Sequence, residues 1–150
     1  MLDDYEQYEI ECERIRESNG KLLADFEDWL RESNLADQTI SRHVENIDFY
    51  INEYLLYEDA VEPQDGVSDV SMFLGYWFIR KAMWASASSI KSNAASLKKF
   101  YTFLHDRGAV SQDDLDSLKE TIKEEMPEWL ATLARYDDLS ITDMGEVWGL

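Results

Sequence analysis

Apolar residues recur along much of the chain at the three- and four-residue spacing of an amphipathic α-helix. The clearest example is the segment 38–57, in which five aliphatic residues follow this spacing: Ile40, Val44, Ile47, Ile51 and Leu55. Side chains at this spacing lie on one face of a helix, so the segment predicts a helix with one buried side. Asp37 is the candidate N-cap, because its short side chain can accept a hydrogen bond from the first turn.

The same pattern predicts three further core helices. Residues 21–33 carry an apolar face and precede Asn34, which tolerates the left-handed conformation that often ends a helix. Residues 68–81 are apolar nearly all round, so we expect this helix to be the most buried element. Residues 86–107 form the fourth helix, which we expect to stop at Gly108.

Weaker patterns flank these four helices. The acidic segment 1–18 predicts a helical extension, which a break at Asn19-Gly20 separates from the core. After the core, a capping-box sequence at 111–114 begins a helix to residue 125, and Pro127 suits the first turn of another helix to residue 136. We therefore divide the chain into an extension at 1–18, a four-helix domain at 19–110, additional helices at 111–136 and a tail at 137–150.

Composition favours an all-α domain. The chain has 150 residues, of which 45% are apolar and 13% aromatic, so it can form a packed core. Only six Gly and two Pro occur, which favours long helices over strands joined by tight turns. The single cysteine, Cys12, cannot form an intramolecular disulfide or make a metal site by itself.

The sequence contains no recognisable catalytic or cofactor motif. It has no glycine-rich phosphate loop, and its two histidines, His43 and His105, lie far apart without paired cysteines. We expect no enzyme activity, no cofactor, no metal and no small-molecule substrate. The acidic N-terminus does not resemble a signal peptide, and the longest apolar run, residues 72–79, is too short to span a bilayer. We therefore expect a cytoplasmic protein with no membrane partner.

Charge is segregated along the chain. The formal net charge is −18, from 32 acidic and 14 basic residues, which by itself argues against a nucleic-acid partner. However, residues 74–105 contain no Asp or Glu and five Lys or Arg, so this window carries +5 and the remaining residues −23. Such a window can still form a local binding surface, because the screening length at physiological salt is about 8 Å.

Two motifs resemble the N-terminal core-binding domain of tyrosine recombinases of the phage-integrase type. The first is Phe26-x2-Trp29-Leu30, followed by Leu35 and by Thr39-Ile40-x2-His43-x3-Ile47, where His43 replaces the aromatic residue usual in the family. The second motif is more specific: Ser88-Ser89-Ile90-Lys91-x5-Leu97-Lys98-Lys99-Phe100-Tyr101-x-Phe103-Leu104-x3-Gly108. The matches fall between residues 26 and 108, and they leave the two ends of the chain unexplained.

The resemblance implies a compact orthogonal bundle of four core helices with a SAM-like fold, here with helical N- and C-terminal extensions. In this family the domain arches over one face of the DNA, and a separate catalytic domain supplies an Arg, a His-x-x-Arg and a Tyr nucleophile. Neither histidine of this chain is followed by Arg three residues later. The resemblance therefore implies a non-catalytic module that binds double-stranded DNA in integration, recombination or their regulation.

The expected DNA contacts are basic and hydroxyl residues of the acid-free window, together with one arginine of the second helix. They are Arg42, Arg80, Lys81, Ser88, Lys91, Ser92, Lys98, Lys99 and Thr102. Lysine and arginine neutralise phosphates, and hydroxyl groups hydrogen-bond phosphate or base edges. Four or five phosphate contacts support only weak non-specific binding, with a Kd of about 10⁻⁴ to 10⁻⁵ M, or binding assisted by a partner.

The residues also admit other interpretations. Lys98 and Lys99 could balance acids on neighbouring helices, and His43 fits a core position better than a DNA contact. Trp84 is the tryptophan best suited to contact a partner. The acidic remainder favours a different function, a helical protein-interaction domain that has lost DNA binding and meets a basic protein or a recombinase. Adaptation to high salt would also explain the surplus of acids.

Overall fold

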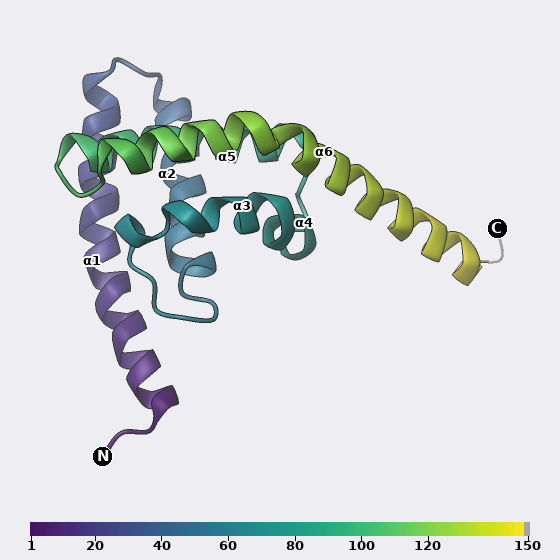
Figure 1. Ribbon diagram of the computed structural model, residues 1–150, viewed down its shortest axis with the longest axis horizontal. Helices are drawn as coiled ribbons and strands as arrows, with labels where there is room; N and C mark the ends of the chain where they lie inside the picture. Colours follow the sequence, from purple (N-terminus) through teal and green to yellow (C-terminus); the bar gives the residue numbers. More distant parts are fainter. Residues whose placement is uncertain (149–150) are drawn as a thin grey trace.

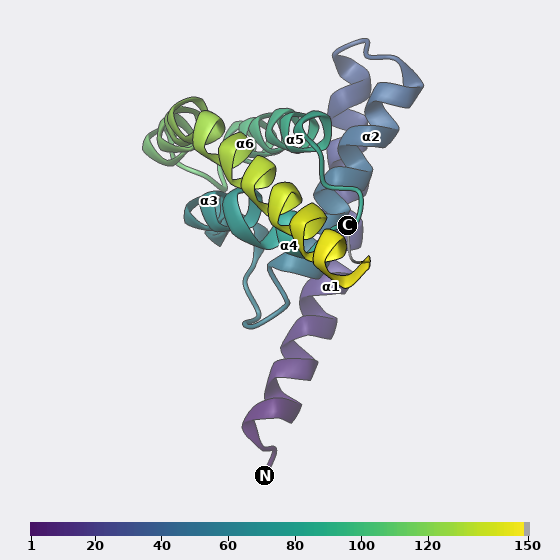
Figure 2. The ribbon, with the colours of Figure 1, turned by 90° about the vertical axis from the view of Figure 1, so that its right-hand side faces the viewer.

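A computed structural model describes the backbone of residues 1–148 and the side chains of residues 1–137. Over residues 1–148 every regular element is a helix, which confirms the all-α prediction. Figure 1 shows α1 (Asp4–Glu32) and α2 (Asp37–Asp48) running antiparallel side by side, with α5 (Ala87–Asp106) and α6 (Gln112–Trp148) crossing them at a steep angle. The first half of α1 projects from this core in both views (Figures 1 and 2), and Figure 1 shows the second half of α6 projecting as well.

Helix α1 is continuous where the sequence predicted a break. Asp3 caps it by accepting a hydrogen bond from the Glu6 amide at 2.8 Å. Asn19 lies in the middle of the helix, is buried, and donates to the side-chain oxygen of Asn52 at 2.8 Å. The predicted break at Asn19-Gly20 is therefore wrong, because a tertiary hydrogen bond fixes Asn19 while nothing crowds the exposed Gly20.

The acidic first half of α1 docks through a small apolar contact. Cys12 and Ile15 are buried against Leu56, and the Tyr8 hydroxyl donates to the Leu56 carbonyl. The remaining side chains of residues 1–11 are exposed apart from Tyr8. One narrow apolar face thus holds the acidic extension to the rest of the chain.

The second predicted helix contains a change of helical type. Asn34 adopts a positive φ of 58° and ends α1 as expected. The N-cap of α2 is Ala36 rather than Asp37, whose carboxylate pairs instead with Arg31 at 3.0 Å. After Asp48 the chain widens into the π-helical segment η1 (Phe49–Tyr54). The predicted apolar stripe continues into η1, where Ile51 remains fully buried.

The third predicted helix is a run of short helical pieces. They are the 3₁₀ segment η3 (Val67–Asp69), α3 (Val70–Met72), the π-helical η4 (Phe73–Trp77) and α4 (Phe78–Lys81). Val70, Phe73 and Phe78 are fully buried, as expected for an apolar element. However, Met72 and Tyr76 are 55% and 52% exposed, so one side of this run lies at the surface.

Helices α5 and α6 form an antiparallel hairpin across the core. Ser86 caps α5 through a reciprocal capping box with Ser89, and Gly108 ends it with a positive φ of 81°. Where the sequence predicted two helices and a tail, α6 runs uninterrupted through Pro127 to Trp148. Its buried residues keep helical spacing on both sides of the proline: Leu115, Leu118, Ile122, Trp129 and Leu133. Packing of this single stripe outweighs the loss of one backbone hydrogen bond at Pro127.

Aromatic side chains join the two layers of helices. Phe26 of α1 lies with its ring centroid 5.3 Å from that of Phe100 and 5.5 Å from that of Phe103, both on α5. Trp129 of α6 approaches Gly75 so closely that an added Cβ would lie 2.7 Å from the indole ring. The core therefore fixes one side of α5 and leaves the opposite side free to carry polar residues.

Candidate nucleic-acid interface

The exposed side of α5 carries most of the expected DNA contacts on one arc. At 100° per residue, six of them fall within about 120° of the helix circumference. They are Ser88, Lys91, Ser92, Lys98, Lys99 and Thr102, which are all exposed or half-buried. We call these six residues the α5 arc. The opposite side of α5 is buried and faces the 63–69 segment, where the Tyr101 hydroxyl donates to the Pro63 carbonyl at 2.8 Å.

The lysines of the α5 arc have no acidic partner among the side chains of residues 1–137. The salt bridges of this part of the chain involve other basic residues: Arg14, Arg31, His105, Arg107 and Arg135. The described side chains therefore do not support the interpretation that Lys98 and Lys99 balance acids on neighbouring helices. Lys91 and Lys98 are exposed and Lys99 is half-buried, so a polyanion could reach them.

A polar cluster joins α2 to the edge of the α5 arc. His43 Nδ1 lies 2.7 Å from Ser96 Oγ, and Asn46 Nδ2 donates to Ser96 Oγ at 2.9 Å and to Ser92 Oγ at 3.1 Å. Burial lowers the pKa of His43, and the nearby charges of Lys99 and Arg42 lower it further. These two cations from different helices therefore lie close to one histidine. His43 itself is 5% exposed, which confirms its expected core position.

Arg80 and Lys81 are held by tyrosine side chains. The guanidinium of Arg80 lies 3.9 Å from the Tyr76 ring centroid, and the Lys81 ammonium lies 5.3 Å from that of Tyr57. Lys81 also donates to the Tyr57 hydroxyl at 3.4 Å. These contacts direct both cations toward α3, η4 and the connection after η1. We therefore separate them from the α5 arc.

Two lysines of α6 were missed by the sequence analysis. Lys119 and Lys123 are exposed and lie about 160° around α6 from Thr121 and Glu125. That second pair faces α3, because Ser71 donates a hydrogen bond to Glu125. Lys119 and Lys123 thus lie on the side of the α5–α6 hairpin that points away from α3. Their i, i+4 spacing can be read from the sequence, but the many acidic residues around them made this segment look like an acidic surface.

Two exposed apolar residues, Met83 and Trp84, adjoin the start of α5. Trp84 is 59% exposed, yet its ring packs edge-on against Phe49 at 5.4 Å and lies 6.3 Å from Phe78. Met83 beside it is fully exposed. The expectation that Trp84 contacts a partner is thus compatible with its position at the surface, next to the α5 N-terminus.

The described part of the chain gives no sign of a metal centre or a membrane span. No three His, Cys, Asp or Glu side chains within it are grouped as a metal site requires, and none of its helices is long and apolar enough to cross a membrane. No protein-family model matches the chain, and the comparisons with curated proteins and with solved structures find no match.

Proposed function

We propose that this chain is a non-catalytic DNA-binding module, related to the core-binding domains of tyrosine recombinases and acting in integration, recombination or their regulation. The observation that supports the proposal is the α5 arc, whose three lysines are exposed or half-buried and have no acidic partner among the described side chains. Arg42 extends this charge onto α2, beside His43. In this proposal α5 lies along the phosphate backbone and the hydroxyls of the arc donate to phosphate oxygens.

The charge distribution sets the strength of this binding. Three lysines and one arginine that neutralise four phosphates give a salt dependence of about −3 to −4 in a log–log plot of affinity against salt. Contacts of this number support a Kd of about 10⁻⁴ to 10⁻⁵ M for non-specific DNA at physiological salt. Tighter binding would require base contacts, the lysines of α6 or a partner such as a recombinase.

The first half of α1 favours a second candidate function. It projects from the core (Figure 1) and, together with its cap Asp3, exposes acidic residues over several turns: Asp4, Glu6, Glu9, Glu11, Glu13 and Glu17. An exposed acidic helix on a chain of net charge −18 suits a basic protein as partner. In this alternative the domain binds protein through its acidic surface and does not bind DNA.

The two functions are separated by a DNA titration with charge-matched variants. Fluorescence anisotropy of labelled duplex DNA is followed from low to physiological salt for the wild type and for Lys91→Glu/Lys98→Glu/Lys99→Glu. The control is Arg14→Glu/Arg16→Glu/Lys21→Glu, which changes the net charge equally on the exposed side of α1. We expect the α5 variant to lose binding and the α1 variant to stay within about threefold of the wild type.

Each other outcome has a defined meaning. Absence of binding by the wild type at low salt would refute the DNA-binding proposal and leave the acidic surface as the functional one. Equal losses in both variants would mean that net charge alone governs the interaction. Circular dichroism of each variant checks whether the helices are intact. In the wild type, bound phosphate near Lys99 and Arg42 should also raise the pKa of His43, which histidine NMR measures directly.

A further inference from the structure

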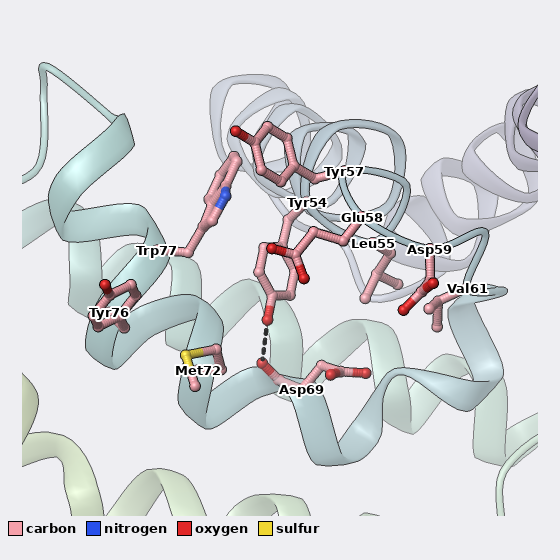
Figure 3. A pocket seen from close by; sticks show the side chains of 10 residues that line it. All are labelled: Tyr54, Leu55, Tyr57, Glu58, Asp59, Val61, Asp69, Met72, Tyr76 and Trp77. Carbon is pink, nitrogen blue, oxygen red and sulfur yellow. Dashed lines mark hydrogen bonds between the residues drawn. The ribbon is translucent and has the colours of Figure 1, made fainter. Parts of the chain in front are cut away.

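A cavity of about 290 Å³ opens at the surface between the end of η1 and the α3–η4 run. Four aromatic residues line it: Tyr54, Tyr57, Tyr76 and Trp77. Three acids line it too: Glu58, Asp59 and Asp69. We call these seven residues the tyrosine–carboxylate pocket. Figure 3 shows Trp77, Tyr76 and Tyr57 on one side and Asp59 and Asp69 on the other, with Tyr54 and Glu58 between them.

The aromatic rings of the pocket meet at steep angles. The Trp77 ring stands at 63° to that of Tyr54, with centroids 5.2 Å apart, and at 67° to that of Tyr57, with centroids 5.7 Å apart. Tyr57 and Tyr76 are each about half exposed. Aromatic rings in a protein core are covered by other side chains, whereas Tyr57 and Tyr76 remain exposed beside this cavity. A cavity at the small end of the usual range suits a single chemical group.

The carboxylates of the pocket are not neutralised by the protein. None of the three forms a salt bridge with a described side chain. Burial raises the pKa of Asp69, and the charge of Asp59 raises it further. Burial also raises the pKa of Tyr54 to about 12, with contributions from Asp69 and Glu58. The acids therefore repel one another within a partly desolvated site, and a bound cation would relieve that repulsion.

The cations nearest to the pocket do not fill this role. Arg80 stacks on Tyr76 and Lys81 lies over Tyr57, so two of the tyrosines already bind positive charge. Neither cation reaches a carboxylate of the pocket within salt-bridge distance, and neither lines the cavity. The rings of Tyr54 and Trp77 carry no such contact among the described side chains. The space between these rings and the three carboxylates is thus left for a positive group from outside.

We propose that the tyrosine–carboxylate pocket binds an alkylammonium group, either a lysine side chain, free or methylated, or a small quaternary ammonium compound. Aromatic faces attract such cations through the negative face of the ring, and the carboxylates supply the countercharge. A bare metal ion fits less well, because the three acids are not grouped as metal ligands and aromatic walls offer it no lone pairs. This site is independent of the α5 arc and of DNA binding.

Fluorine NMR of fluorotryptophan-labelled protein tests the proposal, with the Trp77 signal assigned from a Trp77→Phe sample. The ligands are choline and the trimethyllysine and lysine derivatives blocked at both ends. The matched control ligand is 3,3-dimethylbutanol, which has the shape of choline without its charge. We expect the cationic ligands to shift the Trp77 signal at millimolar concentration and the neutral ligand to leave it unchanged. Tighter binding of choline than of the lysine derivatives would identify a small-molecule ligand. Tighter binding of a lysine derivative would identify a side chain of a partner protein.

Two further variants protect the test against changes in folding. In Glu58→Gln/Asp59→Asn both substituted residues are exposed, and we expect at least about tenfold weaker binding of the same ligand. The control Asp116→Asn/Glu120→Gln makes the same chemical changes on α6 and should leave the affinity unchanged. Equal shifts from choline and its neutral analogue, no shift with any cation, or equal weakening in both variants would each overturn the proposal.

Discussion

The buried hydroxyls of Tyr50 and Tyr101 connect η1 and α5 to the segment 63–66. The Tyr50 hydroxyl donates to the Gly66 carbonyl at 2.7 Å and the Tyr101 hydroxyl to the Pro63 carbonyl at 2.8 Å, while the two hydroxyl oxygens lie 3.1 Å apart. Each hydroxyl has one hydrogen, so two hydrogens are shared among the two carbonyl contacts and the contact between the hydroxyls. A Cβ at Gly66 would lie 2.8 Å from the Tyr50 hydroxyl oxygen, so a residue without a side chain is required at this position.

His43 makes the stability of the fold depend on pH. Burial, Lys99 and Arg42 all lower its pKa in the folded state, whereas in the unfolded chain it returns to about 6.5. Below pH 6.5 the unfolded state therefore binds more protons, so the free energy of unfolding should fall as the pH is lowered through this range. Urea unfolding at a series of pH values measures the effect, and His43→Gln should remove part of the slope. A histidine signal that titrates in the folded protein at or above 6.5 would contradict this account.

At the scale of the element, the continuity of α1 predicts a stabilising substitution. Gly20 lies inside the helix and is exposed, and a Cβ added there meets nothing within 4 Å. Gly20→Ala should therefore raise the free energy of unfolding by about 0.5–1 kcal/mol, because alanine loses less backbone entropy in a helix. Urea unfolding of both proteins gives the difference. Gly108→Ala is the contrasting variant, since its φ of 81° should make the same change destabilising. Loss of stability in Gly20→Ala would show that α1 is broken at this residue.

Local signals predicted the elements that depend on local interactions. The start of the fourth helix at residue 86, the stop at Asn34 and the glycine after α5 lie as the sequence indicated, because each depends on interactions within one turn of its own helix. The errors fall where tertiary contacts decide. Asn52 holds Asn19 within α1, and Trp129 packs against Gly75 just after Pro127, where α6 continues as a helix. The π-helical turns of η1 and η4 have no signature in the spacing of apolar residues.

The same division applies to the two candidate sites. The α5 arc could be predicted, because 100° per residue places its lysines and hydroxyls together without knowledge of any other helix. The absence of acidic partners for Lys98 and Lys99 among the described side chains depends on how α2 and α6 pack, so the sequence left it open. The tyrosine–carboxylate pocket could not be predicted. It exists only because residues 54–61 and 69–77 come together across a connection with no regular pattern.

At the scale of the whole molecule, acidic charge dominates the surface. The net charge of −18 is spread over the projecting half of α1, the connection after η1 and the exposed side of α6. The salt bridges of the described residues all join side chains that are at least partly exposed, so each contributes little to stability. We therefore expect repulsion among the unpaired acids to outweigh attraction within the salt bridges. Added salt should then screen more repulsion than attraction.

Salt should consequently stabilise the fold while it weakens DNA binding. Raising NaCl from about 0.01 M to 1 M shortens the screening length from about 30 Å to 3 Å, which removes most of the self-repulsion. A gain of about 1–2 kcal/mol would raise the Tm by about 2–8 °C for a chain of this size. Thermal unfolding measures the shift. Glu6→Gln/Glu9→Gln/Glu13→Gln/Glu17→Gln, which removes four charges from the exposed side of α1, should be more stable at low salt and less sensitive to added salt. A Tm that does not change with salt in the wild type, or an unchanged salt response in this variant, would mean that the acids are too well solvated to repel one another.

The α5 arc responds to the same salt in the opposite direction, because released counterions drive its contact with phosphate. Opposite signs for stability and DNA affinity in one salt series would therefore distinguish a basic interface on an acidic fold from a uniformly charged surface.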